Sequence, residues 1–160
     1  MGTHSLIHFE EVSNGKVVTY VIIYQQMDGY PYGVGFYLAN FLKRIKIING
    51  WRSGDSDKAN GMGCLAAQFI SQEKCGIGNF YIHPLEQKED IHEWNYHVTY
   101  DTDQKKLRIT VVELVESNGR SKVMTIDEFQ KYCCDEGGYD IKDAFEIEKI
   151  SKITSVSRDR

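Results

Sequence analysis

Two glycines near the start of the chain stand where a phosphate-binding loop could form. They lie in QQMDGYPYGVGFYLANFL, which begins at residue 25 and passes from a strand-like segment through a turn into a helical pattern. Backbone N–H groups of such turns bind phosphate. The dinucleotide fingerprint, however, needs a glycine three positions after Gly35, where this chain has Leu38, and the Gly-Lys-Ser/Thr signature is missing. Two interpretations remain, a tight corner or a ligand site formed by Tyr30 and Tyr32 beside a helix N-terminus.

A second group of polar residues shares one face of a predicted helix. Asn60, Cys64 and Gln68 are spaced four apart, which places them on the same side of a helix. A thiol there could be a nucleophile beside a histidine, but no cysteine-hydrolase signature surrounds it, and free cysteines are commonly buried for packing. The hypothesis of an enzyme or small-ligand binder places a site between the turn and this helix. Its residues are Asp28, Tyr30, Tyr32, Gly33, Gly35, Asn60, Cys64 and Gln68.

The histidines and paired aspartates form no metal-binding signature in the sequence. His92 and His97 resemble the zinc motif HExxH, but three residues rather than two separate Glu93 from the second histidine. On a helix the two imidazoles would diverge, and on a strand their odd spacing predicts opposite faces. Asp101 and Asp103 fit a hairpin turn, because aspartate side chains bond to nearby backbone amides. The sequence therefore predicts no metal, no cofactor and no catalytic residue.

A basic segment interrupts a chain whose net charge is −4. No acidic residue occurs between Pro31 and Gly54. Cations at the end of a helix complement its dipole, and the acidic total makes nucleic acid a partner that is not favoured. Nucleic-acid binding is kept as the second hypothesis, with an indole that stacks on a base. Its residues are Lys43, Arg44, Lys46, Trp51 and Arg52.

The composition is typical of one globular domain. The chain has 160 residues, of which 41% are hydrophobic and 26% charged, and this length suffices to bury a sizeable core. We expect a single domain over residues 1–152 and a flexible C-terminal tail over 153–160. Four cysteines without a CxxC pair, and no apolar N-terminal run, favour an intracellular location over secretion and predict no membrane span.

The order of predicted elements indicates an α+β fold. Asn14-Gly15 joins two extended runs into a hairpin, and residues 101–104 join two more. Helical periodicity covers residues 34–45 and 60–73, and Thr125 with Glu128 fits a capping box at the start of another helix. Because the strands come in hairpins with helices between them, we expect a mainly antiparallel sheet of about five or six strands with about three or four helices packed on it. The strand after Asn14-Gly15 is apolar on both sides, which predicts cover on both faces.

Several motifs together resemble a family of small proteins from phages, bacteria and large DNA viruses. They are the start MGTHSLIHF, the DGYP turn followed by a helix with LANFL, the segment ANGMGCLAAQFI and the strand GNFYIHPL, spread over roughly the first 100 residues. The family start is MGTR-like, and His4 replaces its basic residue here. The resemblance implies a viral origin and a location in the host cytoplasm or the virion. It implies no activity, because none is known for the family. We therefore expect a non-enzymatic viral accessory or virion-associated protein that binds a protein partner or itself.

Overall fold

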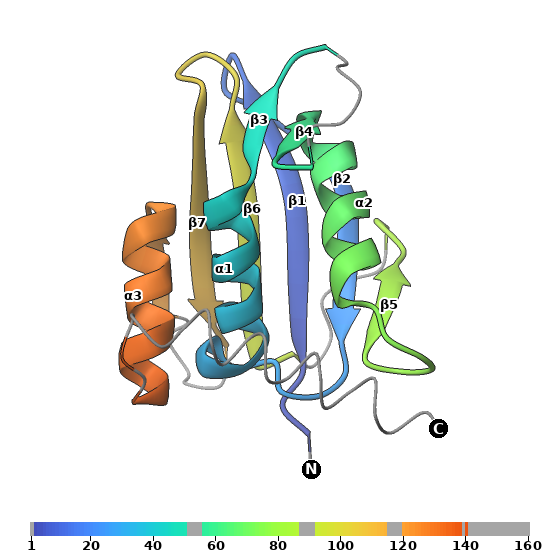
Figure 1. Ribbon diagram of the computed structural model, residues 1–160, viewed down its shortest axis with the longest axis vertical. Helices are drawn as coiled ribbons and strands as arrows, with labels where there is room; N and C mark the ends of the chain where they lie inside the picture. The colour runs from blue at the N-terminus through green and yellow to red at the C-terminus, as the bar shows by residue number, and fades with distance from the viewer. Residues whose placement is uncertain (1, 51–55, 87–91, 115–119, 139, 141–160) are drawn as a thin grey trace.

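Six strands form the main sheet, in the spatial order β5-β2-β1-β6-β7-β8 (Figure 1). The structure is a computed structural model that describes residues 2–50, 56–86, 92–114, 120–138 and 140. Neighbouring strands run antiparallel except for the central pair, β1 and β6, which is parallel. The strands are β1 (Ser5–Ser13), β2 (Lys16–Gln25), β5 (Phe80–His83), β6 (Trp94–Asp101), β7 (Lys106–Glu113) and β8 (Arg120–Met124).

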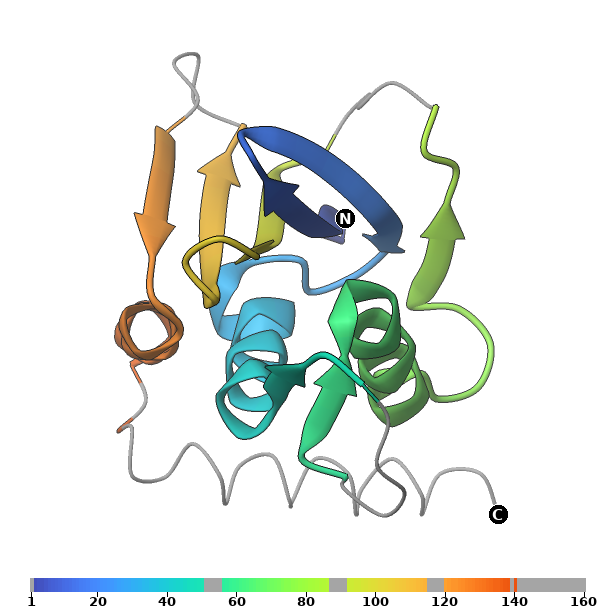
Figure 2. The ribbon, with the colours of Figure 1, turned by 90° about the horizontal axis from the view of Figure 1, so that it is seen from above.

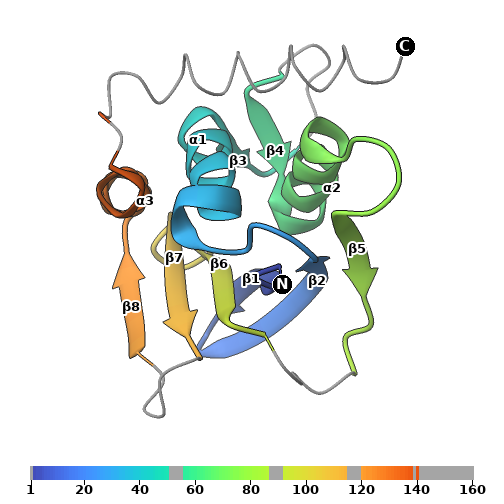
Figure 3. The ribbon, with the colours of Figure 1, turned by 90° about the horizontal axis from the view of Figure 1, so that it is seen from below.

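Helices and a second, two-stranded sheet lie on one side of the main sheet (Figures 2 and 3). The helices are α1 (Phe36–Arg44), α2 (Gly61–Glu73) and α3 (Ile126–Gly137), and a π-helical turn, η1 (Pro31–Gly35), leads into α1. The small sheet pairs β3 (Lys46–Ile48) with β4 (Lys58–Asn60) in parallel. The predicted α+β fold with a single domain is therefore confirmed. The predicted tail over 153–160 lies outside the described residues.

The hydrophobic core lies between the helices and the sheet. Alternate strand residues point into it, among them the fully buried Ile7, Phe9 and Tyr96. From the helices, the rings of Phe41 and Phe69 meet with their centroids 5.2 Å apart. Burying a side chain of this size stabilises the fold by roughly 1.5–3 kcal/mol relative to leaving it exposed, so this layer is the main source of stability.

Local sequence signals act as predicted at the turns and caps. Asn14 (φ 49°) and Gly15 (φ 74°) both adopt left-handed conformations, as a two-residue hairpin turn of type I′ requires. The hydroxyl of Thr125 accepts the N–H of Glu128, and the Glu128 carboxylate accepts the N–H of Thr125, which completes the capping box of α3. All four cysteines are free thiols. Among the described residues, no helix is both long and apolar enough to span a membrane.

The expectation that β2 is covered on both faces holds only for the second half of the strand. Its first half is open to solvent, with Val17, Val18 and Tyr20 each at least 45% exposed. Only the second half is buried, at Ile22 and Ile23. The exposed residues lie on both sides of the strand, since Val17 pairs with Val12 and Val18 with Glu11, and the second half is covered on both sides, at Ile22 and at Ile23.

Candidate metal site

The side of the main sheet turned away from the helices carries all five histidines of the chain. We call it the helix-free face, and it consists of the strand residues that alternate with the core residues. On β1 these are Leu6, His8 and Glu10, between the core residues Ile7 and Phe9. His4 directly precedes β1 with the same parity. The register places His83 of β5 and His97 of β6 on this face too, and the ring of His92 lies 5.5 Å from that of Tyr24, also on this face.

Strand pairing sets three of these histidines in one row across the sheet. His97 of β6 pairs with His8 of β1, His8 pairs with Ile22 of β2, and Ile22 pairs with His83 of β5. Neighbouring strands lie about 4.8 Å apart, so His8 and His97 are in direct contact, whereas His83 is two strands away from His8. The carboxylate of Glu10 lies one row further along the same face.

His8, Glu10 and His97 form a compact cluster with metal-ligating groups. One ligating atom from each residue lies within 4.8 Å of the other two, and this is the one such group of three found in the part of the chain that the structure describes. The rings of His8 and His97 stack with centroids 4.3 Å apart and planes 15° from parallel. His97 Nδ1 lies 3.1 Å from Glu10 Oε1. Thr99 donates its hydroxyl to Glu10 Oε2 at 3.3 Å, which holds the carboxylate in place.

The surroundings keep the two residues of β1 in the protonation states that a metal needs. The pKa of His8 is lowered to about 4, mainly by burial and then by the neighbouring His97. The Glu10 carboxylate raises it by less than His97 lowers it. His8 is therefore neutral near pH 7. Burial alone would raise the pKa of Glu10, but its hydrogen bond with His97 and the charge of that imidazole outweigh burial and leave the pKa below its ordinary value. Glu10 is therefore ionised, and a neutral imidazole and a carboxylate are both competent ligands.

An ion can join these groups once their side chains rearrange. Ligands at about 2.0–2.2 Å from an ion lie at most about 4.4 Å from each other, and the ligating atoms of the cluster already lie within 4.8 Å of one another. An imidazole binds an ion in its ring plane, so the two nearly parallel rings of His8 and His97 must turn apart to share one. The hydrogen that His97 shares with Glu10 would be displaced if both atoms became ligands.

No family model, curated protein or solved structure matches this chain. The function therefore has to be argued from the geometry of its own residues, and the viral origin that the motifs imply stays a prediction.

Sequence reasoning missed this cluster because it treated the histidines by their spacing along the chain. His8 and Glu10 are two residues apart on a strand, and His97 joins them only through the parallel pairing of β1 with β6. The prediction that His92 and His97 lie on opposite faces of one strand is wrong. β6 begins at Trp94, so His92 belongs to the connection before the strand, where strand alternation does not apply.

The DGYPYG turn is explained by close packing of its backbone. A Cβ on Gly29 would lie 2.7 Å from the carbonyl carbon of His4, and one on Gly33 would lie 2.2 Å from the carbonyl oxygen of Asp28. The buried hydroxyl of Tyr96 donates to the Gly29 carbonyl at 2.9 Å. Small residues are thus required where the turn crosses the end of the sheet, as the interpretation of a tight corner expects.

The other predicted ligand residues of the turn contact one another. Tyr30 donates its hydroxyl to the carboxylate of Asp28 at 2.9 Å, and its ring stacks on Tyr32 with centroids 4.1 Å apart. Gly35 approaches the α3 thiol of Cys133, which a Cβ would meet at 3.2 Å. These contacts stabilise the turn itself.

The predicted polar face of α2 lies far from this turn. The turn is at one end of the sheet, whereas α2 begins at the opposite end, beside β4 (Figure 1). The Asn60 side chain accepts the N–H of Gly50 at 3.1 Å, and Gln68 donates to the carbonyl of Lys58 at 2.9 Å. Cys64 packs against the core, half-buried. The structure thus does not bring the eight predicted ligand residues together in one place.

The basic segment is only partly described. Lys43 forms an ion pair with Asp127 at the start of α3, which neutralises one of its charges. Arg44 and Lys46 are exposed at the end of α1 and in β3. Trp51 and Arg52 lie outside the described residues, so nucleic-acid binding through this segment stays a prediction.

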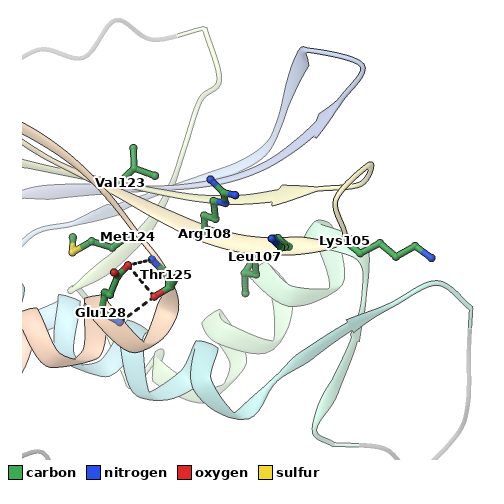
Figure 4. A pocket seen from close by; sticks show the side chains of 8 residues that line it. Lys105, Leu107, Arg108, Val123, Met124, Thr125 and Glu128 are labelled. Carbon is green, nitrogen blue, oxygen red and sulfur yellow. Dashed lines mark hydrogen bonds between the residues drawn. The ribbon is translucent and has the colours of Figure 1, made fainter.

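A hollow of about 530 Å³ lies where β8 leads into α3. Cationic side chains line it, but a carboxylate that also lines it disfavours an anion. Thr125 and Glu128 at its base are bonded to each other in the capping box, and the Glu128 carboxylate faces the hollow (Figure 4). The side chains of Lys105 and Arg108 point away from this base (Figure 4). Its lining is Lys105, Lys106, Leu107, Arg108, Val123, Met124, Thr125 and Glu128.

Proposed function

We propose that this protein binds a divalent transition-metal ion, Zn²⁺ in the first place, through His8, Glu10 and His97 on the helix-free face. The single observation that supports the proposal most is the meeting of these three ligating groups within 4.8 Å, from two strands whose rigid pairing fixes their spacing. The site is built on strands rather than loops, which favours a defined geometry.

The donor set selects the class of ion. Two imidazole nitrogens and one carboxylate oxygen suit Zn²⁺ and its late first-row neighbours, whereas Mg²⁺ and Ca²⁺ prefer sites made of oxygen alone. Three ligands from the protein leave a further position for water or for a group of a partner molecule. The proposal is therefore one of binding and requires no catalytic residue, in keeping with the expected role of an accessory protein.

Competition for Zn²⁺ between a chromophoric chelator and the tag-free, metal-free protein tests the proposal. We expect wild type to take up a first equivalent with micromolar or tighter affinity. Glu10→Gln and His97→Ala each remove one ligand and should weaken this equivalent at least tenfold. Glu11→Gln is the matched control, because Glu11 is next to Glu10 on β1 but points to the other face. It should bind as wild type does.

Two results would contradict the proposed site. One is a wild-type protein that takes up no Zn²⁺ at micromolar free ion while remaining folded by circular dichroism. The other is equal affinity of wild type and Glu10→Gln for the first equivalent. In either case the contact between His97 and Glu10 is a structural ion pair.

A further inference from the structure

We propose that the hollow where β8 leads into α3 binds an extended segment of a partner protein, which adds to β7 as a strand and carries an apolar residue between two acidic ones. The hollow measures about 530 Å³, a size typical of ligand pockets. None of the residues that line it belongs to the cluster of His8, Glu10 and His97. The inference is therefore independent of the proposed metal site.

The hollow lies where the main sheet has a gap. β8 pairs with β7 only from Ile109 to Glu113, because the chain turns into α3 after Met124. The first three residues of β7, Lys106 to Arg108, pair with β6 on one side. Among the described residues, no strand lies opposite them on the other side. A free strand edge of this kind is a template for pairing with another chain.

The backbone of Leu107 presents its hydrogen-bonding groups to this gap. Residues of an antiparallel strand bond alternately to the neighbouring strand on either side. The N–H of Leu114, just after β7, donates to the Glu93 carbonyl, just before β6, at 2.8 Å. The even-numbered residues of β7 therefore bond towards β6 and the odd-numbered ones towards β8. Leu107 is the odd-numbered residue beyond Ile109, the last one that β8 reaches, so one residue of an added antiparallel strand can exchange both hydrogen bonds with it.

The side chains on one face of β7 favour acidic partners. Lys106 and Arg108 lie on the helix-free face, whereas Leu107 packs against the core on the other face. Added residues opposite the two cations lie beside them on the helix-free face, so acidic side chains at these positions form cross-strand pairs of opposite charge. Arg108 donates one N–H to the Gln104 side chain at 3.1 Å, and its guanidinium has five such donors. Charge complementarity therefore places acids at both outer positions.

The other face favours an apolar residue at the middle position. An added residue opposite Leu107 points to the side of α3, where Met124 is buried and the Glu128 carboxylate faces the hollow (Figure 4). Hydrogen bonds with Thr125 lower the pKa of Glu128, so this carboxylate is charged near pH 7 and repels another one. An apolar side chain would instead extend the packing of Leu107 and Met124. The two faces together select the acidic–apolar–acidic pattern and disfavour a free anion.

Fluorescence anisotropy with a labelled peptide, capped at both ends and with the core Thr-Glu-Val-Glu-Thr, tests the proposal. Metal-free protein is used with a chelator present. We expect saturable binding that weakens as salt is raised. A matched peptide with lysines in place of both glutamates should bind more weakly, although the net charge of −4 attracts it to the protein. Methylation of the valine nitrogen removes the N–H that the Leu107 carbonyl accepts and should weaken binding about tenfold.

Protein variants locate the binding site. Lys106→Gln and Arg108→Gln should each weaken binding of the glutamate peptide about twofold to fivefold, as expected for exposed charge pairs. Lys74→Gln is the matched control, because it removes the same charge beside Tyr81 of β5, at the opposite edge of the sheet. It should bind as wild type does. The NMR signal of the Leu107 amide should shift on binding, and its hydrogen exchange should slow.

Four results would overturn the proposal. The first is no saturation of folded wild type up to about 1 mM peptide. The second is equal binding of the glutamate and lysine peptides, and the third is equal binding of the N-methylated peptide. The fourth is a dimer in sedimentation that Arg108→Gln abolishes, which would assign the hollow to a second copy of the chain. Because the chelator keeps metal out of every assay, failure here leaves the proposed function standing.

Discussion

Acidification should destabilise the metal-free protein because His8 is buried in its neutral form. Its pKa in the folded protein is about 4, against an ordinary value of 6.5. Between these two values the unfolded chain binds a proton that the folded chain does not. The stability contributed by neutral His8 is therefore complete above about pH 6.5 and is lost as the pH falls towards 4.

The size of the effect follows from the shift. One pKa unit corresponds to 1.36 kcal/mol, so the whole change is about 3 kcal/mol, and about 2 kcal/mol of it should be lost between pH 7 and pH 5. Glu10 acts in the same direction, but its pKa lies below its ordinary value of 4.5, so its contribution is lost only at lower pH. The interval from pH 7 to pH 5 therefore isolates His8 from this carboxylate.

Urea unfolding at a series of pH values, with a chelator present, measures this loss. His8→Gln removes the titrating group, so its free energy of unfolding should fall by about 2 kcal/mol less than that of wild type between pH 7 and pH 5. Parallel curves for the two proteins would refute the reasoning. So would an imidazole signal of His8 that titrates near pH 6.5 by NMR.

Three further substitutions and one control in α2 test the packing that holds the DGYPYG turn and α3, each by urea unfolding. Gly29→Ala should cost about 3 kcal/mol of stability, because its Cβ would lie 2.7 Å from the backbone of His4. In the control Gly63→Ala, no atom lies closer than 3.7 Å to the new Cβ, so the change should be neutral or stabilising by about 1 kcal/mol. Equal stabilities of these two variants would contradict the argument. Tyr96→Phe removes the buried hydrogen bond to Gly29 and should cost about 1 kcal/mol, so an unchanged midpoint would count against that bond. Thr125→Ala should cost about 1 kcal/mol through loss of the α3 cap, and an unaltered stability would show the cap to be dispensable.

The parts of the fold that the sequence predicts correctly are those specified within a few residues. Asn14-Gly15 dictates its turn because both positions need a positive φ, and the spacing of Thr125 and Glu128 dictates where α3 begins. The parallel pairing of β1 with β6 has no such signal. The paired residues are 89 apart, as with Ser5 and Trp94, and their contact depends on how the whole sheet assembles.

The candidate metal site depends on this non-local pairing, and the sequence therefore hides it. His8 and Glu10 alone are two alternate polar residues on a strand, a pattern that any solvent-facing strand shows. What distinguishes them is the low exposure of His8, only 4%, on a face that no described helix covers. The ring of His97, which stacks on that of His8, supplies part of this burial. Burying a neutral imidazole at this position costs free energy that an aliphatic side chain would not cost. That cost is the physical reason to look for an ion at this cluster, and a weaker first equivalent of Zn²⁺ in Glu10→Gln will show that the ion binds there.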